Sequence, residues 1–179
     1  RRIMKFSPSD EPPDLARRRN LLMMLAGMTL GGGLAACGST QMAPDVVYTV
    51  LDGTTNHTAA LRGQVVLVNF WATSCAPCVK AMPALVATHQ QFAARGLHTL
   101  AVAMQHDAPA AVSQFAQSRQ LPFDVVIDNT GAVARAFGGV RITPTTFVID
   151  RRGAIAQHST GEPDAARLNA LLARLLAQT

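Results

Sequence analysis

The residues with the clearest chemical potential are two cysteines, Cys75 and Cys78, which are separated by two positions. They follow the apolar run Val65–Phe70 and precede a stretch with helical spacing, so the pair is expected where a buried strand turns into a helix. Backbone N–H groups without partners and the helix dipole favour a thiolate at that position. The spacing therefore predicts thiol–disulfide exchange, with Cys75 as the exposed nucleophile and Cys78, one helical turn later, as the shielded resolving thiol.

Two other roles for the pair are open on the residues alone. A zinc site needs further ligands, and the only other cysteine of the chain is Cys37. The histidines show no paired ligand spacing; they are His57, His89, His98, His106 and His158. A purely structural bridge would close a loop too short to stabilise the chain much. We therefore favour redox exchange over a metal site or a structural bridge.

The composition is typical of one folded domain preceded by a leader. Of the 179 residues, 49% are hydrophobic and 15% are charged, so a sizeable core is expected and general disorder is not. The formal net charge is +5, and six of the basic residues but only three of the acidic ones lie in residues 1–37. Because no basic stripe with interleaved aromatic residues follows, we exclude nucleic acid as a partner.

Residues 1–37 have the features of a signal peptide. The arginines at 17–19 precede the uncharged stretch Leu21–Ala36, which contains four glycines and is shorter than the roughly 20 apolar residues of a membrane-spanning helix. The stretch ends in Leu34–Cys37, which resembles the lipobox of bacterial lipoproteins. That resemblance implies cleavage before Cys37 and attachment of a diacylglyceryl group to its thiol. The alternative is an uncleaved anchor with an incidental cysteine.

The leader also bears on the route and the destination of export. Arg18–Leu22 resembles a twin-arginine motif, but basic residues precede every signal core, so both export routes stay open. Gly38 stands where an Asp retains lipoproteins in the inner membrane of proteobacteria, which allows sorting to the outer membrane. We expect an extracytoplasmic, lipid-anchored protein on the periplasmic face of a bacterial membrane, with residues 38–44 as a short flexible tether.

The rest of the chain alternates between strands and helices. Runs of β-branched and apolar residues indicate the strands, and apolar residues at helical spacing indicate the helices. The expected strands are 46–51, 65–70, 97–104, 124–127, 145–149 and 154–158, and the expected helices are 76–94, 108–119 and 164–176. This order predicts an α/β fold with a mixed central sheet between helical layers.

From Tyr48 onward, the sequence resembles the TlpA/ResA-like branch of the thioredoxin superfamily. The resemblance rests on Leu61–Ala72 before the dithiol, on Pro83 in the following helix and on Gly139–Asp150. It implies a thioredoxin-like mixed central sheet flanked by helices over residues 45–179, with an extra helix–strand insertion between residues 107 and 128. It also implies a thiol–disulfide oxidoreductase of the protein-disulfide reductase type.

The same resemblance implies further site residues and partners. Pro144 stands where the family has its cis-proline, opposite the dithiol, and substrate binding is implied for Trp71, Thr143 and Pro144. Apart from the redox-active disulfide Cys75–Cys78, neither a cofactor nor a metal is expected. The implied partners are client proteins with cysteines, a membrane electron carrier that acts as the reductant, and the membrane itself through the lipid anchor.

Three positions depart from the pattern of related proteins. Ser74 stands where Trp is frequent, Ala81 stands where apocytochrome-reducing relatives have Glu, and Asn69 replaces the buried Asp of thioredoxin. Without these two carboxylates, an obvious proton acceptor for the resolving thiol is missing. His106 and Asp107 follow a predicted strand and could line the site, but we expect a solvated loop there.

Two other functions of a thioredoxin-like fold stay open as alternatives. One is a binding module for copper or for a client protein, although copper carriers of similar fold use C-x-x-x-C plus a His. The other is a peroxiredoxin-like peroxidase, in which a Thr lies three positions before the nucleophile. Here Thr73 lies only two positions before Cys75, so we favour exchange of thiols and disulfides.

Overall fold

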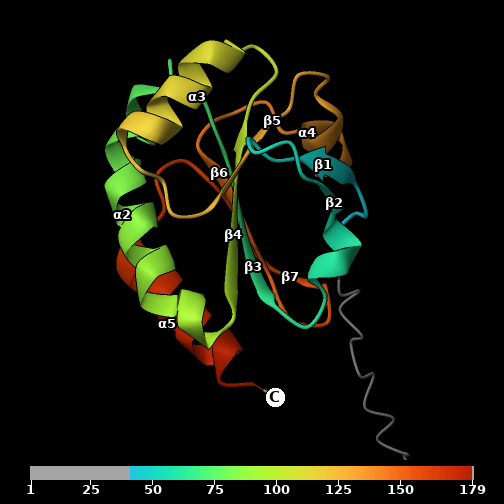
Figure 1. The fold of residues 1–179 in the computed structure, drawn as a ribbon. Coiled ribbons are helices and arrows are strands. Elements are labelled where there is room, and N and C mark those ends of the chain that lie inside the picture. The colour runs from blue at the N-terminus through green and yellow to red at the C-terminus, as the bar shows by residue number, and fades with distance from the viewer. Residues whose placement is uncertain (1–40, 179) are drawn as a thin grey trace, which may run out of the picture. The chain divides into compact units, whose positions relative to one another are not determined.

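A computed structural model describes residues 41–178, which form a five-stranded mixed sheet, a two-stranded ribbon and flanking helices (Figure 1). The predicted α/β fold is confirmed. The strands are β1 (Val47–Thr49), β2 (Thr55–His57), β3 (Val65–Trp71), β4 (Leu97–Ala103), β5 (Asp124–Ile127), β6 (Thr145–Ile149) and β7 (Ile155–Thr160). The helices are α2 (Ala76–Phe92), α3 (Pro109–Ser118), α4 (Ala132–Ala136) and α5 (Ala165–Leu176), with the short 3-10 turns η1 (Thr58–Leu61) and η2 (Ala93–Arg95).

The large sheet has the strand order β5–β4–β3–β6–β7. Its central strand, β3, is parallel to β4 and antiparallel to β6, and all seven of its residues are buried. A continuous apolar run is expected of a strand that is covered on both faces. The predicted helix–strand insertion is confirmed, since α3 leads into β5, which pairs parallel with β4 at the edge of the sheet.

The apolar residues of β3 up to Phe70 alternate between two separate cores, and Trp71 belongs to a third apolar cluster together with Cys78. One core lies between the sheet, β1 and the segment around α4, and the Phe70 and Phe137 rings meet in it with their centroids 5.6 Å apart. The other lies between the sheet and helices α2 and α5, and it includes the completely buried Leu67 and Leu172. Figure 1 shows α2 and α5 over one face of the sheet and β1, β2 and α4 over the other. The sheet is therefore covered on both sides.

Helix α2 follows β3 closely and ends at Phe92, slightly before the predicted end at residue 94. It continues into η2, and the chain then turns at Gly96, whose φ is +96°. A left-handed backbone of this kind favours glycine, which has no Cβ to clash with the preceding turn. The turn leads directly into β4, so it returns the chain to the sheet.

Two elements, β2 and α4, are absent from the sequence prediction. The three residues of β2 are mostly exposed and show no apolar alternation, and they form a strand by pairing with β1. The five residues of α4 are too few to show helical periodicity. Its first turn is fixed by the buried Asp128, whose carboxylate accepts hydrogen bonds from the backbone N–H groups of Val133 at 3.2 Å and Ala134 at 2.8 Å. Pairing with β1 therefore determines β2, and the nearby Asp128 carboxylate determines the start of α4.

The first described residues are hydrogen-bonded to the sheet, although residues 38–44 were expected to form a flexible tether. The N–H of Ala43 donates to the carbonyl of Gly153 at 2.8 Å, and the N–H of Ile155 donates to the carbonyl of Gln41, also at 2.8 Å. Met42 lies opposite Ala154 in antiparallel orientation. This pairing occurs because β7 is an edge strand with backbone groups that no neighbouring strand occupies. The folded part thus begins earlier than the predicted boundary at residue 45.

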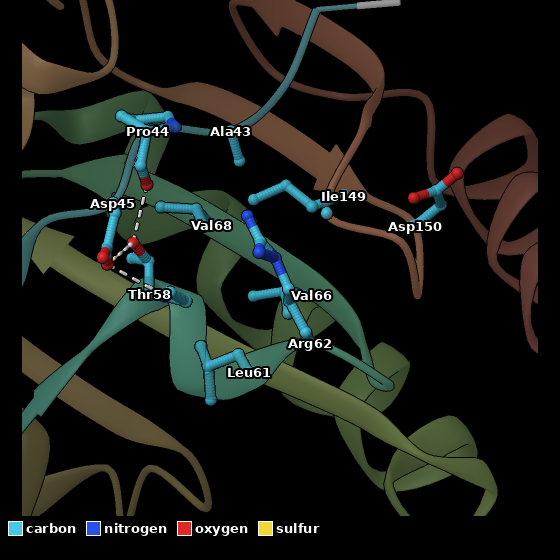
Figure 2. Close-up of a pocket in the computed structure, with 12 residues that line it drawn as sticks. Ala43, Pro44, Asp45, Thr58, Leu61, Arg62, Val66, Val68, Ile149 and Asp150 are labelled. Carbon is cyan, nitrogen blue, oxygen red and sulfur yellow. Dashed lines mark hydrogen bonds between the residues drawn. The ribbon is translucent and has the colours of Figure 1, made fainter.

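Ala43 and Pro44 continue across the sheet. Figure 2 shows them beside Val68 of β3 and Ile149 of β6. The cavity between them has a volume of about 20 Å³. Because that is room for little more than one water molecule, the segment closes the core here rather than forming a ligand site.

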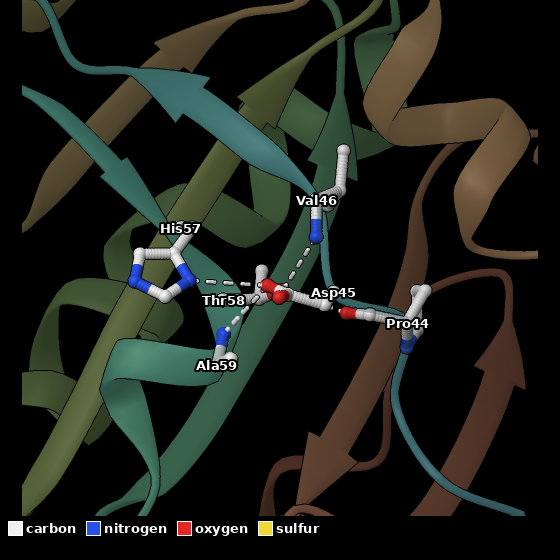
Figure 3. Close-up of polar contacts among 6 residues, drawn as sticks. All are labelled: Pro44, Asp45, Val46, His57, Thr58 and Ala59. Atoms are coloured by element: carbon white, nitrogen blue, oxygen red, sulfur yellow. Dashed lines mark hydrogen bonds and ion pairs between the residues drawn. The ribbon is translucent and has the colours of Figure 1, made fainter.

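A polar network fixes the entry of this segment into β1 (Figure 3). Thr58 Oγ1 donates a hydrogen bond to the carbonyl of Pro44 at 2.6 Å and accepts one from the N–H of Val46 at 2.9 Å. The carboxylate of Asp45 accepts a hydrogen bond from the N–H of Ala59 at 3.1 Å and lies 3.3 Å from Nδ1 of His57. The Ala59 bond, together with His57, lowers the pKa of Asp45 below its usual value.

Candidate active site

Cys75 lies in the turn between β3 and α2, as the sequence predicts. Its backbone is extended (φ −87°, ψ 97°), and its sulfur accepts a hydrogen bond from the N–H of Cys78 at 3.2 Å. Pro77 suits the first helical turn because the N–H that it lacks would have no partner within the helix. The Cys75 sulfur therefore caps α2 at the end where the helix dipole favours a negative charge.

Cys78 forms a disulfide with Cys75, and their Cα atoms are 5.2 Å apart. The two sulfur-bearing residues differ in their surroundings. Cys78 is 3% exposed and packs with Trp71 and Met82 between the sheet and α2, whereas Cys75 is partly exposed. An external reactant can therefore reach Cys75 while Cys78 stays inside, which is the division that the spacing predicts.

The tertiary structure brings Pro144 beside this dithiol. The Thr143–Pro144 bond is cis, as the family resemblance implies. Pro144 precedes β6, and it lines one cavity together with Cys78. The carbonyl of Pro144 accepts a hydrogen bond from the N–H of Gly161 at 2.7 Å, which ties this loop to the end of β7. Binding of clients at Thr143 and Pro144 remains a prediction.

The cavity beside Cys78 has a volume of about 210 Å³. Asn69 and Ala81 both line it, so the two positions at which related proteins have carboxylates do lie near the resolving thiol. Glu162, in the loop between β7 and α5, contributes a carboxylate to the lining of this cavity. Glu162 is exposed and lies 3.5 Å from Lys80 Nζ, and the sequence offered no signal for its position because the loop is distant in the chain. The cavity wall is lined by Asn69, Cys78, Ala81, Met82, Ala84, Leu85, Thr88, Pro144, Thr146, Glu162, Pro163, Ala165 and Leu168.

The expectation of a solvated loop at residues 106–107 is wrong for one of the two. His106 is exposed, but Asp107 is only 7% exposed. Its carboxylate accepts hydrogen bonds from the backbone N–H of Thr73 at 2.6 Å and from the Thr73 hydroxyl at 2.5 Å. The hydroxyl of Thr73 is therefore bonded to Asp107, which gives the peroxidase alternative no support. Burial of Asp107 was not predictable, because its partner lies far away in the chain.

Trp71 lies in a different place from the one predicted for it. A substrate-binding residue must be reachable, but Trp71 is completely buried. Its indole packs against Phe115 of α3, with the ring centroids 5.0 Å apart. The implied contact with clients is therefore wrong for this residue, because its side chain is completely buried and its ring is covered by α3. The indole instead lies in the same apolar cluster as Cys78.

Other predicted features concern residues 1–40. Cys37 and the signal peptide lie outside the residues that the structure describes. Among residues 41–178, no helix is long and apolar enough to cross a membrane. In the same range, no three His, Cys, Asp or Glu side chains gather closely enough to hold a metal ion.

A Cys-x-x-C pair at the start of the helix that follows the central strand of a mixed sheet defines a class, the thioredoxin-fold proteins with a redox-active dithiol. The chain belongs to the AhpC/TSA family, whose sequence model matches residues 40–158.

Named relatives agree with this class. The thiol-disulfide oxidoreductase ResA of Geobacillus kaustophilus is 38% identical over 126 residues, which is 70% of either chain. ResA of Bacillus thuringiensis subsp. konkukian is 31% identical over 133 residues, or 74% of this chain and 76% of the relative. The predicted enzyme class is confirmed, and the protein is a thiol-disulfide oxidoreductase.

Solved structures show the same fold. A solution structure of a Neisseria meningitidis protein assigned to the thioredoxins has a TM-score of 0.72 and 34% identity, covering 78% of this chain and 93% of that one. A thiol:disulfide interchange protein of the thioredoxin family from Chlorobium tepidum has a TM-score of 0.70 and 27% identity. The match covers 77% of this chain and 97% of that one. The predicted thioredoxin-like fold is therefore confirmed.

Proposed function

We propose that this oxidoreductase reduces disulfides of cysteine-containing client proteins on the periplasmic face of a bacterial membrane, to which a lipid on Cys37 anchors it. The observation that carries the proposal is the asymmetry of the dithiol, with a reachable Cys75 and a buried Cys78. The signal peptide and lipobox in the sequence support the location. The resemblance to the TlpA/ResA-like branch supports the direction of electron flow.

The reaction begins with both cysteines reduced. The thiolate of Cys75 attacks one sulfur of the client disulfide, and the other client sulfur leaves as a thiolate with the bonding electron pair. The Cys78 thiol then loses its proton and attacks the Cys75 sulfur of this mixed disulfide. The second client sulfur leaves as a thiolate, and the Cys75–Cys78 disulfide remains. Two electrons have moved from the protein to the client.

A further turnover requires the dithiol to be restored. The proposed source is a membrane electron carrier that presents a dithiol, which would reduce the Cys75–Cys78 disulfide by the same two exchange steps in reverse. Anchoring on the membrane would keep the protein close to such a carrier, so the proposed location and the proposed reductant support one another.

A redox titration can test the direction of electron flow. Trp71 is the only tryptophan and lies in one cluster with Cys78, so its fluorescence can report the state of the dithiol. A reductase is expected to have a potential nearer to that of thioredoxin, about −270 mV, than to that of the oxidant DsbA, about −120 mV. A potential near the DsbA value would overturn the reductase assignment and leave exchange chemistry intact.

Trapping can identify the clients. The Cys78→Ser variant should accumulate mixed disulfides between Cys75 and client proteins in extracts of the exported fraction, and Cys75→Ser is the matched control that should capture none. Consumption of hydrogen peroxide by the wild type, at a rate above that of the Cys75→Ser control, would instead support the peroxidase alternative.

A further inference from the structure

A buried carboxylate holds the turn that precedes the nucleophile. Asp107 lies just beyond the end of β4, where its N–H donates a hydrogen bond to the carbonyl of Met104 at 2.9 Å. The N–H of Met104 in turn donates to the carbonyl of Trp71 at 3.0 Å. The chain after β4 is thus folded back beside the end of β3, and this places the Asp107 side chain next to the active-site turn.

Both oxygens of this carboxylate bind the same residue. Oδ2 accepts from the Thr73 N–H at 2.6 Å, and Oδ1 accepts from the Thr73 hydroxyl at 2.5 Å. A carboxylate that is only 7% exposed is costly to bury unless such bonds compensate for its lost hydration. Hydrogen bonds to a charged acceptor are also about twice as strong as neutral ones. The pair therefore fixes both the backbone and the side chain of Thr73.

Thr73, which the Asp107 carboxylate holds, lies two positions before Cys75. The turn between them is closed by a hydrogen bond from the Cys75 N–H to the carbonyl of Ala72 at 3.1 Å. The backbone of Cys75 is consequently held from two sides, by this turn and by α2, which it caps. A shift of the turn would carry the sulfur with it.

We propose that Asp107 is a positioning residue for thiol–disulfide exchange, and that it acts through Thr73 to hold the Cys75 sulfur in the orientation that attacks a client disulfide. This role requires exchange through Cys75, on which the proposed function also rests, but it requires neither the reductive direction nor the membrane location. Exchange between proteins depends on the alignment of the attacking sulfur, and displacement by about 1 Å can cost about 100-fold in rate.

A role in folding alone makes different predictions from a positioning role. Asp107→Asn keeps the geometry but not the charge, because its amide oxygen can accept from the Thr73 N–H while its NH₂ donates to the Thr73 oxygen. Asp107→Ala removes both bonds. Thr73→Val retains the backbone bond and removes only the hydroxyl bond, so it provides an intermediate case that disturbs the core less.

The experiment compares two reactions of the reduced full-length protein. One is oxidation by a disulfide-bonded peptide, followed by Trp71 fluorescence. The other is alkylation by iodoacetamide between pH 5 and 9, which reports the reactivity of the Cys75 thiolate towards a small reagent. Thermal unfolding is measured on every variant. Cys75→Ser defines the absence of exchange, and peptide mass spectrometry separates alkylation of Cys75 from alkylation of Cys37 and Cys78. If the wild type fails to oxidise with the peptide, the exchange assignment itself is wrong.

For Asp107→Ala we expect peptide exchange to slow by about tenfold or more, and for Thr73→Val by about threefold. Alkylation at high pH should stay within about 1.5-fold of the wild type in both variants, and Asp107→Asn should keep its exchange and alkylation rates within the same factor. Three outcomes would overturn the role. They are unchanged exchange in folded Asp107→Ala or Thr73→Val, equal losses in exchange and alkylation, and an Asp107→Asn variant as slow as Asp107→Ala.

Discussion

The side-chain amide of Asn69 donates a hydrogen bond to Thr146 Oγ1 at 3.0 Å, which joins β3 to β6 beneath the cavity that also holds Cys78. The position at which thioredoxin has a buried Asp is thus occupied by a neutral group whose bond is directed to the next strand. Ala81, one turn after Cys78 in α2, contributes only a methyl group to the same cavity. Neither residue can take the proton of the resolving thiol.

We therefore expect Ala81→Glu to accelerate the resolution of the mixed disulfide several-fold. The cavity of about 210 Å³ has room for the longer side chain, and a carboxylate beside Cys78 can act as a general base. Stopped-flow measurement of Trp71 fluorescence after mixing with a peptide disulfide can follow this step. Ala81→Gln has the same shape without the basic group, so equal rates for the Glu and Gln variants would contradict the prediction.

The order in which the two cysteines react is a second test. Cys75 should be alkylated first by limiting iodoacetamide in the reduced protein, because it is partly exposed and caps α2, whereas Cys78 is 3% exposed. Peptide mass spectrometry of the partly modified protein gives the order. Preferential modification of Cys78 would reverse the assigned roles, and slow modification of both would favour a structural bridge.

Lipidation of Cys37 is a third prediction, and it concerns a residue outside the described range. In bacterial cells, labelled palmitate should enter the wild-type protein and should not enter Cys37→Ser. The mature wild type should also begin at Cys37, which intact-mass measurement can establish. A mature protein that retains residues 1–36 and carries no label would refute the lipobox interpretation.

The stability of the fold should depend on the ionisation of His98. Burial lowers the pKa of this imidazole, and the nearby Asp124, whose Oδ2 lies 3.2 Å from its Nε2, only partly offsets that effect. The pKa of His98 is thus lower in the folded protein than in the unfolded chain, so the unfolded chain binds the imidazole proton more tightly. The free energy of unfolding therefore falls as the pH drops below about 6.5, the usual pKa of His.

Thermal unfolding at pH 7.5 and pH 5.5 checks this dependence. The melting temperature of the wild type should be lower at pH 5.5 than at pH 7.5. The melting temperature of His98→Gln should fall by less over the same pH change. His89, whose pKa burial also lowers, should contribute in the same direction. His106→Gln is the matched control, since His106 is exposed and should leave the difference unchanged. The prediction fails if His98→Gln and His106→Gln show the same loss as the wild type.

The sequence by itself determined the parts of this protein that depend on local patterns. The apolar run of β3, the helical spacing of α2 and the Cys-x-x-Cys pair between them are neighbours in the chain, so their arrangement follows from short-range geometry. The same holds for β5, whose limits the pattern of β-branched residues predicts correctly. The helix predicted from residue 164 is confirmed as α5, although Asp164 itself precedes the helix and accepts a hydrogen bond from the Arg167 N–H.

Only the tertiary structure decided which distant residues surround the dithiol. Asp107 and Glu162 are ordinary acidic residues in loops, and nothing adjacent to them indicates that one is buried against Thr73 and the other lines the cavity beside Cys78. Trp71 lies within a segment that resembles the family, yet it is buried because α3 packs against its ring. Contacts of this kind depend on how the helices and loops pack on the sheet. They join residues far apart in the chain, so no local spacing pattern predicts them.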